Sequence, residues 1–82
     1  MKLLNEYQMS KWAYEQCKEG NDTEEIRSLI TTSQFAYNYC YQIKDRDDMW
    51  IKIKDPWITK MYCYFVNSRP ELWENSKNEI IK

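Results

Sequence analysis

The chain has 82 residues, with 12 basic and 13 acidic side chains and a formal net charge of −1. A chain of this length forms at most one domain, and its balanced charge lacks the basic excess that draws proteins to nucleic acid or anionic membranes. Because it holds one glycine, two prolines and 16% aromatic residues, we predict a single all-α domain over residues 1–82 with short connections.

Neither a secretory signal nor a membrane span is predicted. Polar Asn5 and Glu6 directly follow residues 1–4, so the apolar core of a signal peptide is missing. No run approaches the ~18–20 apolar residues that span a bilayer. Three cysteines, an odd number at equal spacing, favour a reducing compartment over a disulfide framework. We therefore expect a soluble, cytoplasmic protein.

An internal repeat of 23 residues organises the chain. Without gaps, Cys17, Cys40 and Cys63 share one alignment column, and Tyr39 aligns with Tyr62. Such self-similarity is typical of proteins built from stacked units that cannot bury an apolar face alone. We predict three helix-turn-helix repeats stacked as a short solenoid or compact bundle. They cover about 9–31, 32–54 and 55–77, and a helical extension follows at 75–82.

The first helix of each repeat is predicted from apolar residues at helical spacing, which form one stripe and lack the alternation of a strand. Asp55 followed by Pro56 marks a capped helix start, and Thr32 occupies the same column as Asp55. Met9 in that column cannot cap, so we expect the first helix to begin upstream, near residues 3–4. The stripe consists of Phe35, Ala36, Tyr39, Cys40 and Ile43, with Ile58, Thr59, Tyr62, Cys63 and Val66 in the third repeat and Trp12, Ala13, Gln16 and Cys17 in the first.

The second helix of each repeat is predicted from a capping signature. Asp22, Asp45 and Ser68 stand at equal spacing, and each is followed three residues later by an acid. We expect helices of roughly two to three turns, which need neighbours for stability. Arg46 and Arg69 are expected to bridge neighbouring repeats. The residues predicted to face inward are Ile26, Met49, Leu72, Trp50 and Trp73.

No catalytic, cofactor or metal site is predicted. The chain has no histidine, and its three cysteines are spread along the stack instead of converging on one ion, so we expect them to be small core residues. The acidic pairs, Glu24 with Glu25 and Asp47 with Asp48, lie at predicted helix starts, where the helix dipole favours acids. No glycine-rich phosphate loop occurs. We predict no enzymatic activity and no cofactor.

Tyrosine and lysine side chains are predicted to line one outer face of the stack. Tyr37 and Tyr41 lie one helical turn apart, off the apolar stripe. Three interpretations are open: packing between repeats, a protein interface, in which tyrosine is enriched, and stacking of single-stranded nucleic acid. The weak net charge disfavours the last. The predicted interaction surface consists of Tyr14, Lys18, Tyr37, Tyr41, Lys60 and Tyr64.

The segments Phe35–Arg46 and Arg69–Glu74 resemble a short tandem repeat found in many bacteriophage and large DNA virus proteins. That repeat has the form Ala-Tyr-x-Tyr-Ala-x-x-Val-Ile-Lys-Gly-Arg-Trp-Pro-Glu-Ala-Glu, and this chain has Cys40 and Cys63 in place of an alanine. The resemblance implies a viral origin and a helical repeat fold, and it transfers no catalytic residues.

From these observations we expect a small, non-enzymatic phage protein that binds a host protein in the host cytoplasm, such as a defence or replication factor. The alternative is a self-associating scaffold protein, a homo-oligomer whose open stack ends pair between chains. A weaker alternative is binding of single-stranded nucleic acid, and no membrane partner is expected. The residues expected to cover the two ends of the stack are Leu3, Leu4 and Tyr7 at the front and Ile80 and Ile81 at the back.

Overall fold

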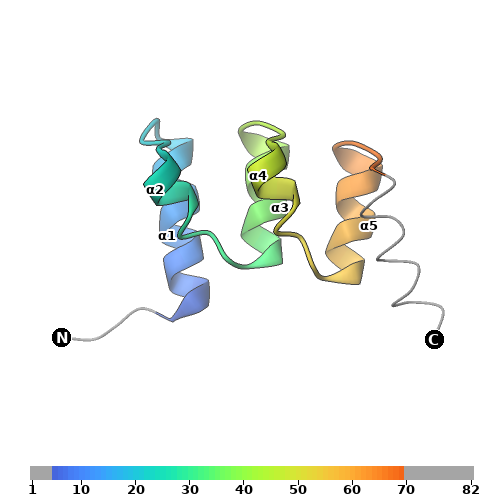
Figure 1. Ribbon diagram of the computed structural model, residues 1–82, viewed down its shortest axis with the longest axis horizontal. Helices are drawn as coiled ribbons and strands as arrows, with labels where there is room; N and C mark the ends of the chain where they lie inside the picture. The colour runs from blue at the N-terminus through green and yellow to red at the C-terminus, as the bar shows by residue number, and fades with distance from the viewer. Residues whose placement is uncertain (1–4, 70–82) are drawn as a thin grey trace.

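The protein is all-helical in the computed structural model, which describes residues 5–69 and contains no strand in that range. The predicted fold class is confirmed at this level. Figure 1 shows the three longer helices standing side by side in one row, with each short helix against the helix that precedes it. The five helices are α1 (Glu6–Lys18), α2 (Glu24–Arg27), α3 (Ser33–Gln42), α4 (Asp47–Trp50) and α5 (Pro56–Phe65).

The starts of α3 and α5 lie where they were predicted, although only one of them is capped by a side chain. The Asp55 carboxylate accepts hydrogen bonds from the amides of Trp57, at 2.8 Å, and Ile58, at 3.1 Å, and Pro56 occupies the first turn of α5. Thr32 has the cap position of α3 but makes no capping bond. Its buried hydroxyl has no hydrogen-bond partner among the described residues.

The first helix begins upstream of Met9, as predicted, but at Glu6 instead of near residues 3–4. Asn5 caps it with a reciprocal pair of bonds: the Gln8 amide donates to Asn5 Oδ1 at 2.8 Å, and the Asn5 amide donates to Gln8 Oε1 at 3.1 Å. This capping box satisfies two amides that the first turn leaves unpaired. At its other end the chain turns away at Gly20, whose φ of 107° suits glycine.

The short helices α2 and α4 have four residues each, fewer than predicted, and the predicted capping roles of Asp22 and Asp45 are wrong. Thr23 caps α2 by accepting from the Ile26 amide at 3.2 Å, and α4 has no side-chain cap. Both aspartates instead bind tyrosines of the next long helix. The predicted helix after Ser68, with Leu72, Trp73 and the extension at 75–82, lies outside the described residues, as do Leu3, Leu4, Ile80 and Ile81.

The core runs along the row of helices and is formed largely by the predicted stripe. Tyr39 and Tyr62 are completely buried, as is Met49 of α4. Trp50 packs against the core as predicted, but it is only half-buried, and its indole nitrogen donates to Asp47 Oδ1 at 2.8 Å. The other buried apolar residues are Ala13, Tyr14, Cys17, Ile30, Phe35, Ala36, Tyr37, Cys40 and Ile53, while Ile26, Ile43, Ile58, Cys63 and Val66 are half-buried and Trp12 is exposed.

Serine hydroxyls join α1 and α3 each to the linker that leads into the next long helix. Ser33 Oγ accepts hydrogen bonds from the amides of Lys54, at 2.8 Å, and Asp55, at 3.1 Å. Ser10, which precedes Ser33 by 23 residues, accepts from the two corresponding amides of the α2–α3 linker at 3.0 and 3.3 Å. Because these amides lie before the first helical turn, the serines supply partners that the helix itself cannot.

Candidate functional site

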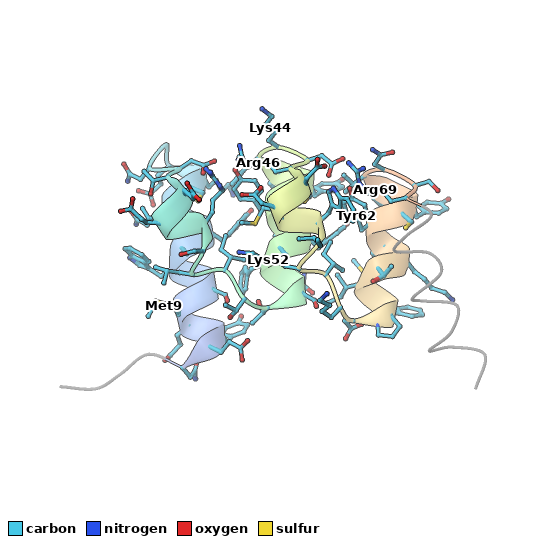
Figure 2. The ribbon with its side chains drawn as sticks, viewed as in Figure 1. Met9, Lys44, Arg46, Lys52, Tyr62 and Arg69 are labelled. Carbon is cyan, nitrogen blue, oxygen red and sulfur yellow. The ribbon has the colours of Figure 1, made fainter. Side chains whose placement is uncertain are left out.

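The junctions between the long helices are closed by tyrosine–aspartate hydrogen bonds. Tyr62 of α5 donates to Asp45 Oδ1 at 2.6 Å, and Arg69 donates from Nε to the Tyr62 oxygen at 2.5 Å and from Nη2 to Asp45 Oδ2 at 3.0 Å. Figure 2 shows Tyr62 and Arg69 together beside α5. At the other junction, Tyr39 donates to Asp22, which also accepts from Arg27 at 2.6 Å. Both clusters are internally satisfied.

The protonation of these clusters indicates a structural role. Burial and the neighbouring carboxylate raise the pKa values of Tyr39 and Tyr62. Burial alone would raise the pKa of Asp22 and Asp45, but the hydrogen bonds from tyrosine and arginine outweigh it and lower both pKa values. The tyrosines are therefore neutral and the aspartates charged across the neutral range, and neither pair exchanges a proton there.

Two of the three cysteines belong to the core. Burial raises the pKa of Cys17 to about 11 and that of Cys40 to about 12, so both remain protonated thiols at neutral pH. Cys63 is half-buried, and no disulfide joins the three. Within residues 5–69, no group of three or more acidic or sulfur ligands is arranged to hold a metal ion.

The arginines expected to bridge neighbouring helix pairs differ in their partners. Arg69 does bridge: it bonds Asp45 and stacks its guanidinium 4.5 Å from the centre of the Trp50 ring. Arg46 instead pairs with Asp48 of its own helix pair, at 2.9 Å. At that junction the bridge comes from Arg27, which reaches Asp48 at 3.2 Å.

The predicted tyrosine–lysine surface is only partly exposed. Tyr14 and Tyr37 are buried, at 9% and 7% exposure, so the interpretation of packing between helices holds for these two and an outward placement is wrong. The Tyr14 ring lies 5.7 Å from the ring of Phe35 because α3 packs against this side of α1. Tyr41 and Tyr64 are exposed, at 52% and 84%. Lys18 is also exposed, and Lys60 is half-buried.

One side of α5 carries a cluster of apolar side chains, which we call the aromatic face: the exposed Trp57, Tyr64 and Phe65 and the half-buried Met61. Trp57 is 68% exposed and Phe65 58% exposed, while Met61 is half-buried. Trp57, Met61 and Tyr64 follow helical spacing and share one side of the helix. The Tyr64 and Phe65 rings meet edge to face at 4.9 Å, and Lys60 Nζ lies 5.8 Å from the Trp57 ring.

The corresponding sides of α1 and α3 are polar. At the positions 23 and 46 residues before Trp57, Met61 and Tyr64, α3 has Gln34, Asn38 and Tyr41, and α1 has three charged residues. Gln34 donates to Asn38 at 2.9 Å. α1 and α3 form helices although these positions are polar, so the packing of the helices does not require apolar residues at the positions of Trp57, Met61 and Tyr64. The charged residues of α1 are Lys11, Glu15 and Lys18.

A hollow of about 310 Å³ lies on α5 beside the aromatic face. The described residues that line it are Lys60, Cys63, Tyr64 and Ser68. Two of them, Lys60 and Tyr64, were predicted as surface residues. The rest of the aromatic face was missed, although the 23-residue alignment contained the signal: Trp57 and Phe65 are apolar residues in columns that are otherwise polar.

Comparison with known proteins gives no match to any protein-family model, curated protein or solved structure. In the part of the chain that the structure describes, no helix has the length and apolar character of a membrane span.

Proposed function

We propose that this protein is a three-repeat helical solenoid that binds another protein through the aromatic face of α5. The repeat arrangement is supported by helix starts 23 residues apart, at 24 and 47 for the short helices and at 33 and 56 for α3 and α5. It is supported further by the tyrosine–aspartate and serine–amide bonds, which recur at equivalent positions. Each unit then covers the next, as in known solenoids.

The exposure of the aromatic face is the observation that carries the binding function. Contiguous exposed apolar patches on small domains usually mark interaction sites, and tryptophan and tyrosine supply much of the energy at protein interfaces. Met61 packs partly against the core, but α1 and α3 have exposed residues at the positions equivalent to Trp57, Tyr64 and Phe65. These three exposed rings are therefore not needed to hold the helices together. Binding to a partner explains them.

The chemistry of α5 defines the kind of partner. Lys60 is the one charged residue among those of α5, and it lies over the edge of the aromatic face near Trp57. A complementary surface has an apolar groove for the rings and an acidic group at its rim. The resemblance to viral repeats supports a host protein as the partner, such as a defence or replication factor, and a role without catalysis.

A site-specific cross-linking experiment tests this proposal. The photoreactive residue p-benzoylphenylalanine is placed at position 57 of α5 or, as the matched control, at the equivalent Lys11 of α1. A protein from the natural host that cross-links only from position 57 is then purified. We expect its affinity to fall about tenfold or more for Trp57→Gln and Phe65→Gln, and to stay unchanged for Lys11→Gln.

Two results would count against protein binding through this face. In the first, the captured protein binds wild type and Trp57→Gln equally well while both are folded by circular dichroism. In the second, Trp57→Gln abolishes salt-dependent binding of a single-stranded oligonucleotide and no protein cross-links from position 57. That result would favour the nucleic-acid alternative, in which aromatic rings stack on bases.

A further inference from the structure

We propose that copies of this protein associate head to tail, with the outer side of α1 in one copy seated in the hollow of α5 in the next. The outer side of α1 is defined by Trp12 and Gln16. This inference rests on the repeat arrangement proposed above. The hollow shares Tyr64 with the aromatic face, but the inference does not use Trp57, Phe65 or an outside partner.

The hollow corresponds to positions that are covered elsewhere in the row of helices. Moving back 23 residues from Lys60 and Cys63 leads to Tyr37 and Cys40, which are buried at 7% and 5% exposure. The same step from Ser68 leads to Asp45, which accepts the hydrogen bond from Tyr62 of α5. The α1–α3 junction has the same arrangement, with Tyr14, Cys17 and Asp22 in these positions. The fourth lining residue, Tyr64, has the exposed equivalents Tyr41 and Lys18, so it marks the rim of the hollow. The part formed by Lys60, Cys63 and Ser68 is therefore the equivalent of a receiving surface that α3 and α5 fill at the two internal junctions.

The side of α1 farthest from α3 carries the equivalents of the residues that fill those surfaces. At the α1–α3 junction, Phe35 packs its ring 5.7 Å from Tyr14 and Tyr39 bonds to Asp22. Their equivalents on α1 are Trp12 and Gln16. Trp12 is 43% exposed, and Gln16 is half-buried. A large ring is thus available at the position that enters a receiving surface.

The two ends are chemically matched. Consider a junction between two copies that has the arrangement of the α1–α3 junction. There, Trp12 of one copy stands where Phe35 stands in the α1–α3 junction, and Lys60 of the other copy stands where Tyr14 stands. The Trp12 ring and the Lys60 ammonium then form a cation–π pair. Gln16 takes the place of Tyr39 and meets Ser68 in the place of Asp22, so that an amide faces a hydroxyl. No acid stands opposite Lys60 in this junction, so the cation–π contact with Trp12 has to offset the burial of its charge.

Such a contact uses different surfaces on the two copies, so it does not close at a dimer. We expect the weight-average mass in sedimentation equilibrium to rise steadily with concentration above the monomer mass of 10.2 kDa. A plateau at the mass of a dimer would indicate a symmetric contact and would overturn the proposal, as would a monomer at all concentrations.

A complementation experiment tests the polarity of the contact. Trp12→Lys places a cation opposite Lys60 and blocks the head, while Cys63→Arg fills the hollow and blocks the tail. Each variant alone should be monomeric. Their equimolar mixture should form a dimer that grows no further, because one variant supplies the intact tail and the other the intact head. A mixture that stays monomeric, with both variants folded by circular dichroism, would overturn the proposal.

A second measurement follows the accessibility of the hollow through the alkylation rate of Cys63, which lines it. Cys63 is the half-buried thiol, whereas Cys17 and Cys40 are buried, so iodoacetamide should modify Cys63 first. Association should slow its alkylation as wild-type concentration rises, and Trp12→Lys should remove this dependence. An alkylation rate independent of concentration in wild type, as expected if another part of the same chain fills the hollow, would contradict the proposal.

The two proposals fail separately. Trp57→Gln on the aromatic face should keep the concentration-dependent mass of wild type and lose the outside partner. Trp12→Lys should lose self-association and keep the outside partner. If Trp57→Gln abolished self-association in a folded protein, the contact would involve the aromatic face and the head-to-tail assignment would be wrong.

Discussion

The hydroxyl of Tyr62 donates to the carboxylate of Asp45 across the α3–α5 junction, at 2.6 Å and 17 residues along the chain. Tyr39 and Asp22 make the same bond over the same separation at the α1–α3 junction. Both tyrosines are completely buried, so each hydroxyl needs this partner in the folded state. The bond fixes the position of each long helix against the one before it.

Loss of the Tyr62 hydroxyl should destabilise the protein. Tyr62→Phe removes the bond to Asp45 and the acceptor of Arg69 Nε, and we expect the free energy of unfolding in urea to fall by about 1–3 kcal/mol. Tyr64→Phe is the matched control, because Tyr64 is 84% exposed and should change the unfolding free energy by less than about 0.5 kcal/mol. Equal losses in the two variants would argue against the junction bond.

The two helix caps at equivalent positions should respond differently to substitution. Asp55 accepts two amide hydrogen bonds at the start of α5, so Asp55→Ala should cost about 1 kcal/mol. The buried hydroxyl of Thr32 has no partner among the described residues, so Thr32→Val should be neutral or stabilising in thermal unfolding. A loss for Thr32→Val as large as for Asp55→Ala would show that the hydroxyl is used.

Lys52 lies in the linker between α4 and α5 and joins that linker to the end of α2. Its Nζ donates to the carbonyl oxygens of Arg27, at 2.8 Å, and Ile30, at 2.9 Å, and Figure 2 shows it between α1 and α3. Lys52→Met keeps the stem but leaves both carbonyls without this donor, and we expect a loss of about 1.5–3 kcal/mol in urea unfolding. The exposed neighbour Lys54 is the control, and Lys54→Met should have little effect on the same measurement.

Acid should destabilise the protein through its paired carboxylates. Burial opposes the effect, but hydrogen bonds and arginine neighbours lower the pKa values of Asp22, Asp45 and Asp48 below the ordinary value of 3.8. Groups with a lowered folded-state pKa stabilise the protein above their unfolded-state pKa, and this stability is lost as pH falls through the folded value. The unfolding free energy should therefore decline below about pH 4. Asp45→Asn should be less stable at pH 7 and show a shallower acid decline.

Alkali should act through the buried thiols. Burial raises the pKa of Cys40 from an ordinary value of 9.0 to about 12 and that of Cys17 to about 11. A raised folded-state pKa gives stability that is complete below the unfolded-state value and is lost as pH rises through the folded value. We expect unfolding free energy to fall progressively above pH 9.0, and less steeply for Cys40→Ala. An identical decline in Cys40→Ala would assign the effect to Cys17 or to the buried tyrosines.

The 23-residue period predicted part of the fold, because several residues in one alignment column have similar surroundings in the structure. It placed α3 and α5, and it put Tyr39 and Tyr62 in one buried column. It could not identify the partners of Asp22 and Asp45. Capping rules consider only neighbours in sequence, and these carboxylates bind tyrosines 17 residues further along.

The spacing of residues in the sequence also could not predict which side of each helix a neighbouring helix covers. Tyr14 and Tyr37 lie off the apolar stripe, and only the packing of the following helix shows that they are buried. The aromatic face was within reach, because Trp57 stands in a column with Lys11 and Gln34. The hollow beside the aromatic face could not be predicted, since a hollow depends on backbone positions that an alignment does not give.

The serine and tyrosine bonds of the two junctions join residues 17 to 22 positions apart. Closing loops this short costs little entropy compared with pairing distant segments, and proteins rich in local contacts fold in microseconds to milliseconds. The first junction needs nothing from α5, so it can assemble on the ribosome while the later residues are still being translated.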